Sequence, residues 1–303
     1  MAAMRKTLND RIFDVVNISL LVLITLIMIY PLYFTIIASI SDPYAVSNGS
    51  VVLWPVGFSL EAYTNVFKES RIWLGYKNTL IYTVFGTLFN LLLTIPGAYV
   101  LSKKQLVGRG IIATYFIIPM YFGGGLIPTY LQVKDLGLID KPYTMIILGG
   151  LSVYNMIMAR VYFQSSIPDE IYESGHIDGA SEFRMFFQIA LPLAKPIIAV
   201  MTLFYAVGRW NDYFTALLYT SKAEYQPLQL VLRGILLMNQ KFMEAINEGN
   251  LDSQTVIDLA RLAHIAQAMK YSVIFIASAP LLIAYPFVQK HFVKGIMVGS
   301  LKG

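Results

Sequence analysis

Several residue types and motifs on which enzymes rely are missing from this chain of 303 residues. It contains no cysteine, which excludes disulfide bonds, thiolate metal sites and cysteine nucleophiles. Its three histidines, His176, His264 and His291, are far apart in the sequence, so they do not suggest a metal site or a catalytic triad. There is no GxxxxGK[ST] loop, so this chain is not expected to hydrolyse ATP. We therefore expect no catalytic residue, no bound metal and no cofactor in this chain.

Charged residues are also scarce. They make up 14% of the chain, against about a quarter in soluble domains, while 56% is apolar and the mean hydropathy is +0.60. The net charge of +5 is spread along the chain without a dense basic run, so nucleic-acid binding is not expected. This composition indicates a polytopic membrane protein in contact with lipid.

Long apolar stretches predict an all-α integral membrane protein with six transmembrane helices, forming a single transmembrane domain over residues 1–303. The first stretch follows a basic start, but it is much too long for a signal peptide, and more spans come after it. The predicted spans cover about 12–39, 76–101, 110–132, 142–163, 196–218 and 271–288.

The third predicted span is expected to break, and two interpretations of the break stay open. Gly123, Gly124 and Gly125 lie between Pro119 and Pro128. Non-helical backbone at membrane depth is tolerated where protein or a water-filled cavity covers it, so the glycines could line a substrate pathway or form a gate. Alternatively, the span ends at Phe122 and the glycines form an external turn.

Basic residues are concentrated at the N-terminus, in the loop at 102–109 and in the C-terminal tail. Short basic loops stay in the cytoplasm, which predicts that both termini lie inside. Residues 166–195 then form a cytoplasmic loop, and residues 220–270 form a long external loop. Helical spacing of apolar residues recurs in that external loop at 228–238 and 255–269.

The cytoplasmic loop at 166–195 predicts two short helices joined by a sharp turn. Ser166 and Asp169 have the spacing of a helix capping box, and the helix that follows should run to about His176. Gly179 gives the backbone freedom for the turn. A second helix is expected from Ser181 to about Ala190, ending at Pro192.

The same loop resembles the EAA loop of binding-protein-dependent ABC importer permeases. That pattern has E-A-A, three residues, G, nine residues and then I-x-L-P, and Glu173, Gly179 and the run 189–192 fit its spacing throughout. Ser174 and Gly175 depart from it, since both replace alanines. The resemblance implies the fold of a type I ABC importer permease. It also implies that the loop couples to an ATPase through Glu173, Ser174, Gly175, Asp178, Gly179 and Ala180.

Three further segments resemble carbohydrate-importer permeases: 210–213, which reads WNDY, the C-terminal run 292–303, and 124–130, which is similar to a subgroup that includes alginate-type systems. The resemblance implies one permease subunit of a bacterial cell-membrane importer for an oligosaccharide. Its partners would be a second permease subunit, two ATPase subunits that use ATP and Mg, and an extracellular solute-binding protein. The resemblance also implies an ATPase-contacting tail made of Gly299, Ser300, Leu301, Lys302 and Gly303.

Polar and aromatic residues within the spans are candidates for the sugar pathway, because such groups are costly in lipid and usually face the interior of a bundle. The candidates are Asn90, Asn155, Tyr205, Arg209, Trp210 and Asn211. Hydrogen bonding between helices is the commoner use of such polar residues, and interfacial packing is an alternative use of the aromatic ones.

An ion-coupled secondary transporter is an alternative function. It would be favoured by inverted repeats and buried acids, but Asp212 is the main acid at depth and it lies near the end of a span. An intramembrane enzyme would need paired acids, a Ser/Lys pair or an HExxH run within the spans, and none is present.

Overall fold

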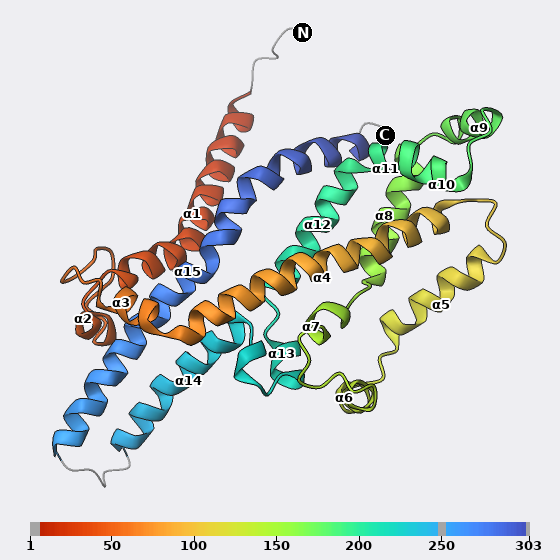
Figure 1. Cartoon of the computed structure of the whole chain (residues 1–303). Helices are drawn as coiled ribbons and strands as arrows, with labels where there is room; N and C mark the ends of the chain where they lie inside the picture. Colours follow the sequence, from red (N-terminus) through yellow and green to blue (C-terminus); the bar gives the residue numbers. More distant parts are fainter. Residues whose placement is uncertain (1–6, 248–252, 301–303) are drawn as a thin grey trace. The chain divides into compact units, whose positions relative to one another are not determined.

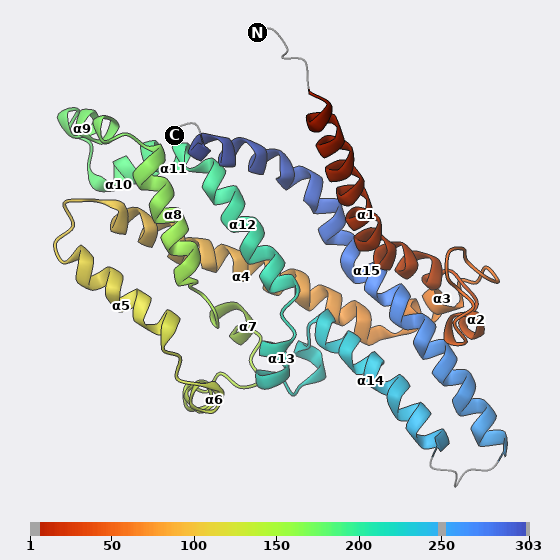
Figure 2. The ribbon, with the colours of Figure 1, turned by 180° about the vertical axis from the view of Figure 1, so that it is seen from behind.

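The structure, a computed structural model, describes residues 7–247 and 253–300, without the side chains of 284–300 and of several residues on either side of the gap. All regular secondary structure in these ranges is helical (Figures 1 and 2). The chain divides into two compact units, which are described separately. The first comprises residues up to 69 together with 232–277, and the second comprises 70–231 together with the residues from 278 onward.

The first unit is built around the end of the long helix α1 (Leu8–Ser39), two short helices α2 (Pro43–Ser47) and α3 (Glu61–Lys68), most of α14 (Leu228–Asn247) and the first half of α15 (Ser253–Ser300). Thr7 and Asp10 form a capping box at the start of α1. Ser272 Oγ donates to the carbonyl of Ser39 at 3.3 Å. His264 Nδ1 lies 2.6 Å from Ser47 Oγ, so α2 is anchored to α15.

The second unit is organised around α4 (Ser70–Ser102), against which α7, α8 and α12 pack. Helix α4 has one buried stripe of mostly small or polar side chains, spaced four residues apart: Tyr82, Gly86, Asn90, Thr94 and Ala98. Such a stripe lets neighbouring helices approach closely and hydrogen-bond in a membrane. The remaining helices of this unit are α5 (Arg109–Tyr121), α6 (Leu126–Asp135), α7 (Thr144–Ile147), α8 (Val153–Ser166), α9 (Asp169–Ile177), α10 (Glu182–Arg184), α11 (Leu191–Leu193), α12 (Lys195–Trp210) and α13 (Phe214–Tyr219).

Three continuous helices in the described residues are long and apolar enough to cross a membrane: α1, α4 and the segment Val256–Ile283 of α15. Helices α1 and α4 include the predicted spans 12–39 and 76–101. Helix α15 includes the predicted span 271–288 but begins at Ser253, well before it. The predicted external loop 220–270 is therefore largely helical, and both of its segments with helical spacing lie in helices, as predicted.

The other predicted spans are interrupted. Helices α5 and α6 are bent by 114° at residues 122–125, so α5 ends at Tyr121 and the three glycines form a turn. This agrees with the helix end at Phe122, one of the two interpretations; the position of the turn relative to a membrane remains a prediction. Residues 182–193 and α12 form a second bent pair, at 78°.

The predicted spans 142–163 and 196–218 are not single helices. The first is divided into α7 and α8 by residues 148–152, where Gly149 has a φ of +67°. The second is divided into α12 and α13 by residues 211–213. The described residues therefore contain three continuous helices and two bent pairs that could cross a membrane, and 142–163 is the predicted span that is not among them.

Candidate functional site

The polar loop at 166–195 ends its first helix with a Schellman motif. Gly179 lies at the position after the C-cap of α9, with a left-handed φ of +71°. Its N–H donates to the carbonyl of His176 at 3.0 Å, and the N–H of Ala180 donates to the carbonyl of Gly175 at 2.9 Å. These two bonds satisfy carbonyls at the end of α9, so the predicted turn at Gly179 is confirmed together with its physical reason.

The predicted start of this loop is wrong. Ser166 is the last residue of α8, and α9 begins at Asp169 after Pro168, without a side-chain capping bond. The serine side chain cannot cap α9 because its residue still belongs to the preceding helix. The carboxylate of Asp169 instead accepts a hydrogen bond from Lys104 Nζ at 2.7 Å. Helix α9 runs to Ile177, one residue beyond the predicted end.

The second helix of the loop starts as predicted, but it does not stop at Pro192. Ser181 Oγ accepts a hydrogen bond from the N–H of Arg184, which caps α10. The chain then continues as a π-helix over Met185–Ala190 and as α11 through Leu193. Pro192 lies in the first turn of α11, where a missing N–H is tolerated. The wider π turn thus carries the chain past the proline.

Two neighbouring residues explain why the loop departs from the E-A-A pattern. Gly175 is buried, and a Cβ added there would lie 2.5 Å from Sδ of Met185, which is itself fully buried. Met185 therefore occupies the space in which an alanine methyl would stand. Ser174 is exposed, and its hydroxyl donates to the carbonyl of Ile171 at 3.0 Å. Glu173 and Asp178 are exposed, so both carboxylates are available to a partner.

A cluster of aromatic rings holds the loop against the end of α4. Tyr99 packs against Phe163, Tyr172 and Phe186, with ring centroids 5.7, 6.2 and 5.0 Å away. Lys103 Nζ lies 3.3 Å from the centroid of the Tyr172 ring and 4.6 Å from that of Tyr99. These are cation–π contacts, so the ammonium of Lys103, the residue after α4, and the ring of α9 attract one another.

Burial shifts the pKa values of ionisable side chains in this cluster. Burial lowers the pKa of Lys103, and the carboxylates of Glu182 and Asp169 act against that shift. Burial raises the pKa of the Tyr172 phenol to about 12, with the charges of Asp169 and Glu182 adding to it. Tyr99 Oη also donates to Glu182 Oε2 at 3.4 Å. Residues of α4, α9 and α10 are thereby joined in one cluster, which we call the Lys103 clamp.

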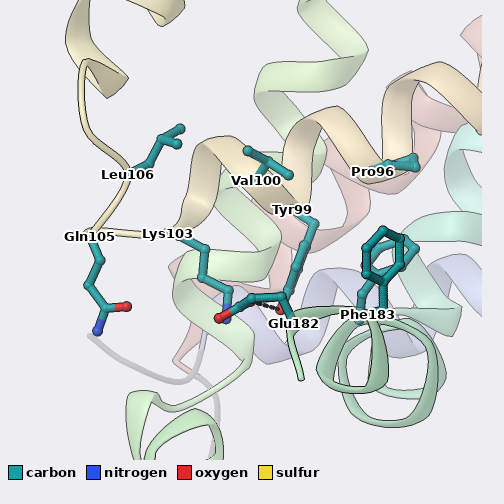
Figure 3. A pocket seen from close by; sticks show the side chains of 9 residues that line it. Pro96, Tyr99, Val100, Lys103, Gln105, Leu106, Glu182 and Phe183 are labelled. Carbon is teal, nitrogen blue, oxygen red and sulfur yellow. Dashed lines mark hydrogen bonds between the residues drawn. The ribbon is translucent and has the colours of Figure 1, made fainter. Parts of the chain in front are cut away.

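A cavity of about 400 Å³ opens beside the Lys103 clamp (Figure 3). Figure 3 shows the hydroxyl of Tyr99 bonded to the carboxylate of Glu182, and Lys103 lines the same cavity. The rest of the wall is mainly apolar and comprises Pro96, Val100, Gln105, Leu106, Phe183 and Phe186. A rigid contact of this kind can pass movement of α10 to α4.

A second candidate site lies where the helical backbone is interrupted at residues 148–152. Arg209 of α12 makes five hydrogen bonds there, one for each of its N–H groups. Four go to backbone carbonyls at 2.7–3.3 Å, and the fifth goes from Nε to Asn90 Oδ1 at 3.0 Å. The four carbonyls belong to Met145, Ile146, Leu148 and Gly149.

Asn90 completes this arrangement, which we call the Arg209 knot. Its Nδ2 donates to the carbonyls of Gly149 and Gly150, both at 2.7 Å, and its side chain is fully buried. Gly86 leaves room for the arginine, since an added Cβ would lie 2.9 Å from its Nε. Broken helices in membranes need such partners for their freed carbonyls, and this knot supplies them. The interhelical alternative is therefore the use that the structure shows for Asn90 and Arg209.

A cavity of about 350 Å³ borders the Arg209 knot. It brings together three of the predicted pathway residues, Asn90, Tyr205 and Arg209. Tyr205 Oη lies 2.6 Å from Thr94 Oγ1, which anchors the phenol to α4. The cavity is also lined by residues that the sequence analysis did not select: Thr129, Leu148, Gly149, Phe204, Gly208, Asp212, Thr215 and Tyr219. The pair Gly149-Gly150 inside an apolar stretch was the signal that could have revealed this break.

The other predicted pathway residues are not among the residues that line this cavity. Trp210 is buried and packs edge-on against Tyr76 with 5.7 Å between ring centroids. Asn211 caps the end of α12, and its Nδ2 donates to the carbonyl of Val207 at 3.0 Å. Asn155 is buried in the first turn of α8, where its N–H donates to Ser152 Oγ. In the predicted tail, Leu301, Lys302 and Gly303 lie outside the described residues, and only the helical backbone of Gly299 and Ser300 is described.

Comparisons with known proteins can be set beside this geometry. Residues 72–298 match a family described as the binding-protein-dependent transport system inner membrane component. The chain is 39% identical to Protein LplC of Bacillus subtilis (strain 168), over 99% of this chain and 98% of that protein. It is 36% identical to the polygalacturonan/rhamnogalacturonan transport system permease protein YtcP of the same organism, over 98% of this chain and 100% of that protein.

Among solved structures, the chain is similar to one chain of a bacterial ABC transporter involved in the import of the acidic polysaccharide alginate. The TM-score is 0.83 and the sequence identity is 34%, over 95% of this chain and 99% of that chain.

Proposed function

Since the chain belongs to the family of inner membrane components of binding-protein-dependent transport systems, we propose that it is a permease subunit of an ATP-driven oligosaccharide importer whose cargo derives from an acidic polysaccharide. The proposed cargo is supported by two full-length similarities, one to a polygalacturonan/rhamnogalacturonan permease and one to a chain of an alginate importer. An ion-coupled secondary transporter has no comparable support.

The proposed partners follow from the family. They are a second permease subunit, two ATPase subunits that bind ATP and Mg, and an extracellular solute-binding protein. The exposed acids of α9 and the left-handed Gly179 support the loop at 166–195 as the surface that meets an ATPase subunit. Helix dipoles and charge-assisted hydrogen bonds favour such carboxylates as contacts for basic groups of a partner.

The proposed topology has six membrane crossings with both termini in the cytoplasm. Helices α1 and α4 and part of α15 are three crossings, and the bent pairs at 109–135 and 182–210 supply two more. The sixth is the interrupted segment formed by α7 and α8, whose broken backbone is covered by protein groups through the Arg209 knot.

Uptake in reconstituted vesicles tests the proposed cargo. The partner solute-binding protein would be purified and screened against oligogalacturonates, oligoalginates and neutral oligosaccharides of matched length. Its preferred ligand would then be offered to vesicles that hold the complete transporter. We expect ATP-dependent accumulation of an acidic oligosaccharide. Accumulation of neutral oligosaccharides alone would overturn the cargo proposal while leaving the family membership intact.

The topology has a direct test because the chain contains no cysteine, so a single introduced cysteine can be labelled without background. Ser181→Cys in the loop after α9 should react with a membrane-impermeant maleimide only from the cytoplasmic side. Ser221→Cys, in the loop before α14, should react only from the outside. Labelling of both from the same side would contradict the proposed topology.

A further inference from the structure

Two arginines lack a counter-ion near the C-terminal end of α8, where the chain enters the loop at 166–195. Arg109 begins α5 and Arg160 lies in α8, and these two helices are in contact. Within the described part of the chain, Arg160 Nε is buried without a hydrogen-bond partner, and no acidic side chain forms an ion pair with either guanidinium. The two positive charges repel one another. Cations in or near a membrane are costly without compensation, so this pair calls for an anion from outside the chain.

A polar cavity of about 480 Å³ lies next to this pair of arginines. Ser102, Lys103, Lys104, Arg109 and Gln164 form one part of its wall, and Asp169, Tyr172, Glu173 and His176 form the other. Gln164 follows Arg160 by one helical turn and therefore lies on the same face of α8. Arg160 is thus on the face of α8 that borders the cavity, one turn further from the loop.

The charges around the cavity do not cancel. Lys104 is paired with Asp169 at 2.7 Å, and Lys103 lies over the two tyrosine rings of the Lys103 clamp. The wall of the cavity carries three cations, Lys103, Lys104 and Arg109, against the two carboxylates of Asp169 and Glu173, and Arg160 lines a much smaller neighbouring cavity. The excess positive charge on this wall lies at Arg109, and Arg160 adds a second cation beside it.

We propose that this cavity binds the phosphate headgroup of an anionic phospholipid, with Arg109 and Arg160 as its ligands. The adjoining surface suits the acyl chains: α5 has no buried residue, and Ile111, Tyr115 and Ile118 stand exposed along one of its faces. Anionic lipids supply phosphate at the depth where α8 and α5 meet the membrane surface, and arginine side chains extend toward that level. The inference needs α5 and α8 to lie in the membrane, but it is independent of the sugar that is carried.

Native mass spectrometry of the intact transporter, purified with its partner subunits, tests this site. The protein would be equilibrated with phosphatidylglycerol or with phosphatidylcholine, and the retained lipid would be counted. Wild type should retain phosphatidylglycerol in preference. Arg109→Gln and Arg160→Gln should each weaken that retention by about fivefold, the effect of removing one basic residue at an anionic surface. Arg11→Gln, on the exposed start of α1, is the matched control and should leave it unchanged.

Additional variants and a competition experiment separate a lipid site from the alternatives. Arg160→Lys keeps the charge and should retain more phosphatidylglycerol than Arg160→Gln. Because Arg160 is partly buried, Arg109→Gln tests the site even if Arg160→Gln fails to assemble. Equal retention of both lipids by wild type, or an equal effect of Arg11→Gln, would overturn the proposal. So would displacement of the lipid by millimolar inorganic phosphate, which would indicate a site for a soluble anion.

Discussion

Arg209 shows how one side chain can stabilise an interrupted helix. The break between α7 and α8 frees backbone carbonyls, and the guanidinium binds four of them at once while it also contacts Asn90. A planar group with five fixed donors can do this, whereas the ammonium of lysine has three. The residue is therefore a structural support for the cavity wall, and its N–H groups are already occupied.

Arg209→Lys should destabilise the transporter even though the charge is kept. Each buried acceptor left without a donor costs about 1–3 kcal/mol. Asn90 also donates to the carbonyl of Gly149, but the other three carbonyls and Asn90 Oδ1 are four acceptors for three lysine donors, so at least one would lose its partner. We expect a lower unfolding temperature in detergent and reduced sugar uptake. Arg184→Lys is the control, because its single described side-chain bond, to Gln188, lies on the surface. Equal stability of Arg209→Lys and wild type would show that the knot is dispensable.

Gly179 is the position in the loop at 166–195 where we expect an added side chain to disturb the backbone. Among the described residues, no atom lies within 4 Å of an added Cβ, so strain arises from the left-handed backbone, at about 1–2 kcal/mol. Gly179→Val should give a transporter that inserts in the membrane but loses its ATPase subunits or hydrolyses ATP without transport. Gly179→Asn is the matched variant, because asparagine tolerates this conformation, and it should be milder.

Co-purification of the ATPase, ATP turnover and uptake in vesicles would be measured for both Gly179 variants. Wild-type values of all three in Gly179→Val would mean that this loop is not the coupling element.

At the scale of elements, the Lys103 clamp joins the loop at 166–195 to α4. Helix α4 also carries Asn90 and the buried stripe against which α7, α8 and α12 pack. Transmission between sites needs a packed element that responds as a unit, and α4 reaches from the clamp to the Arg209 knot. The clamp is therefore the position at which movement of the loop can enter the helices that surround the cavity.

Lys103→Met should weaken this connection while preserving much of the side-chain volume. Removal of the cation abolishes the contacts with Tyr99 and Tyr172, each worth about 0.5–2 kcal/mol. We expect ATP hydrolysis to persist with less sugar transported per ATP. Lys77→Met, near the other end of α4, is the control. An unchanged ratio of sugar to ATP in Lys103→Met would rule out a coupling role, and Lys103→Arg should restore the ratio because it restores the cation.

At the scale of the whole molecule, the long segment at 220–270 is largely helical and contributes most of its residues to the first unit. We expect it to contact the solute-binding protein, since in the proposed topology it is external. Deletion of residues 239–250 would remove the last residues of α14 and reach into the gap at 248–252. ATP turnover should then lose its stimulation by the binding protein while the basal rate survives. Normal stimulation in the deletion variant would show that the segment only connects two helices.

The sequence by itself determined the helical membrane class, the helices predicted at 12–39 and 76–101, and the turn at Gly179. These features depend on local properties: long apolar runs, scarce charge, and the freedom of glycine at a helix end. The segment 173–192 resembles the EAA pattern, and this resemblance also pointed to the family that the comparisons show.

Only the tertiary structure decided what Asn90, Arg209 and Ser166 do. Whether a polar residue in a span faces a substrate or satisfies a backbone depends on which distant carbonyls lie beside it, and those belong to residues about 60 positions away. Pro192 was expected to end a helix, but the helical backbone continues through it after a π-helical turn. No local sequence pattern indicated that turn. Arg109 and Arg160 come close only because α5 packs on α8, since contacts between helices are set by packing and not by sequence spacing.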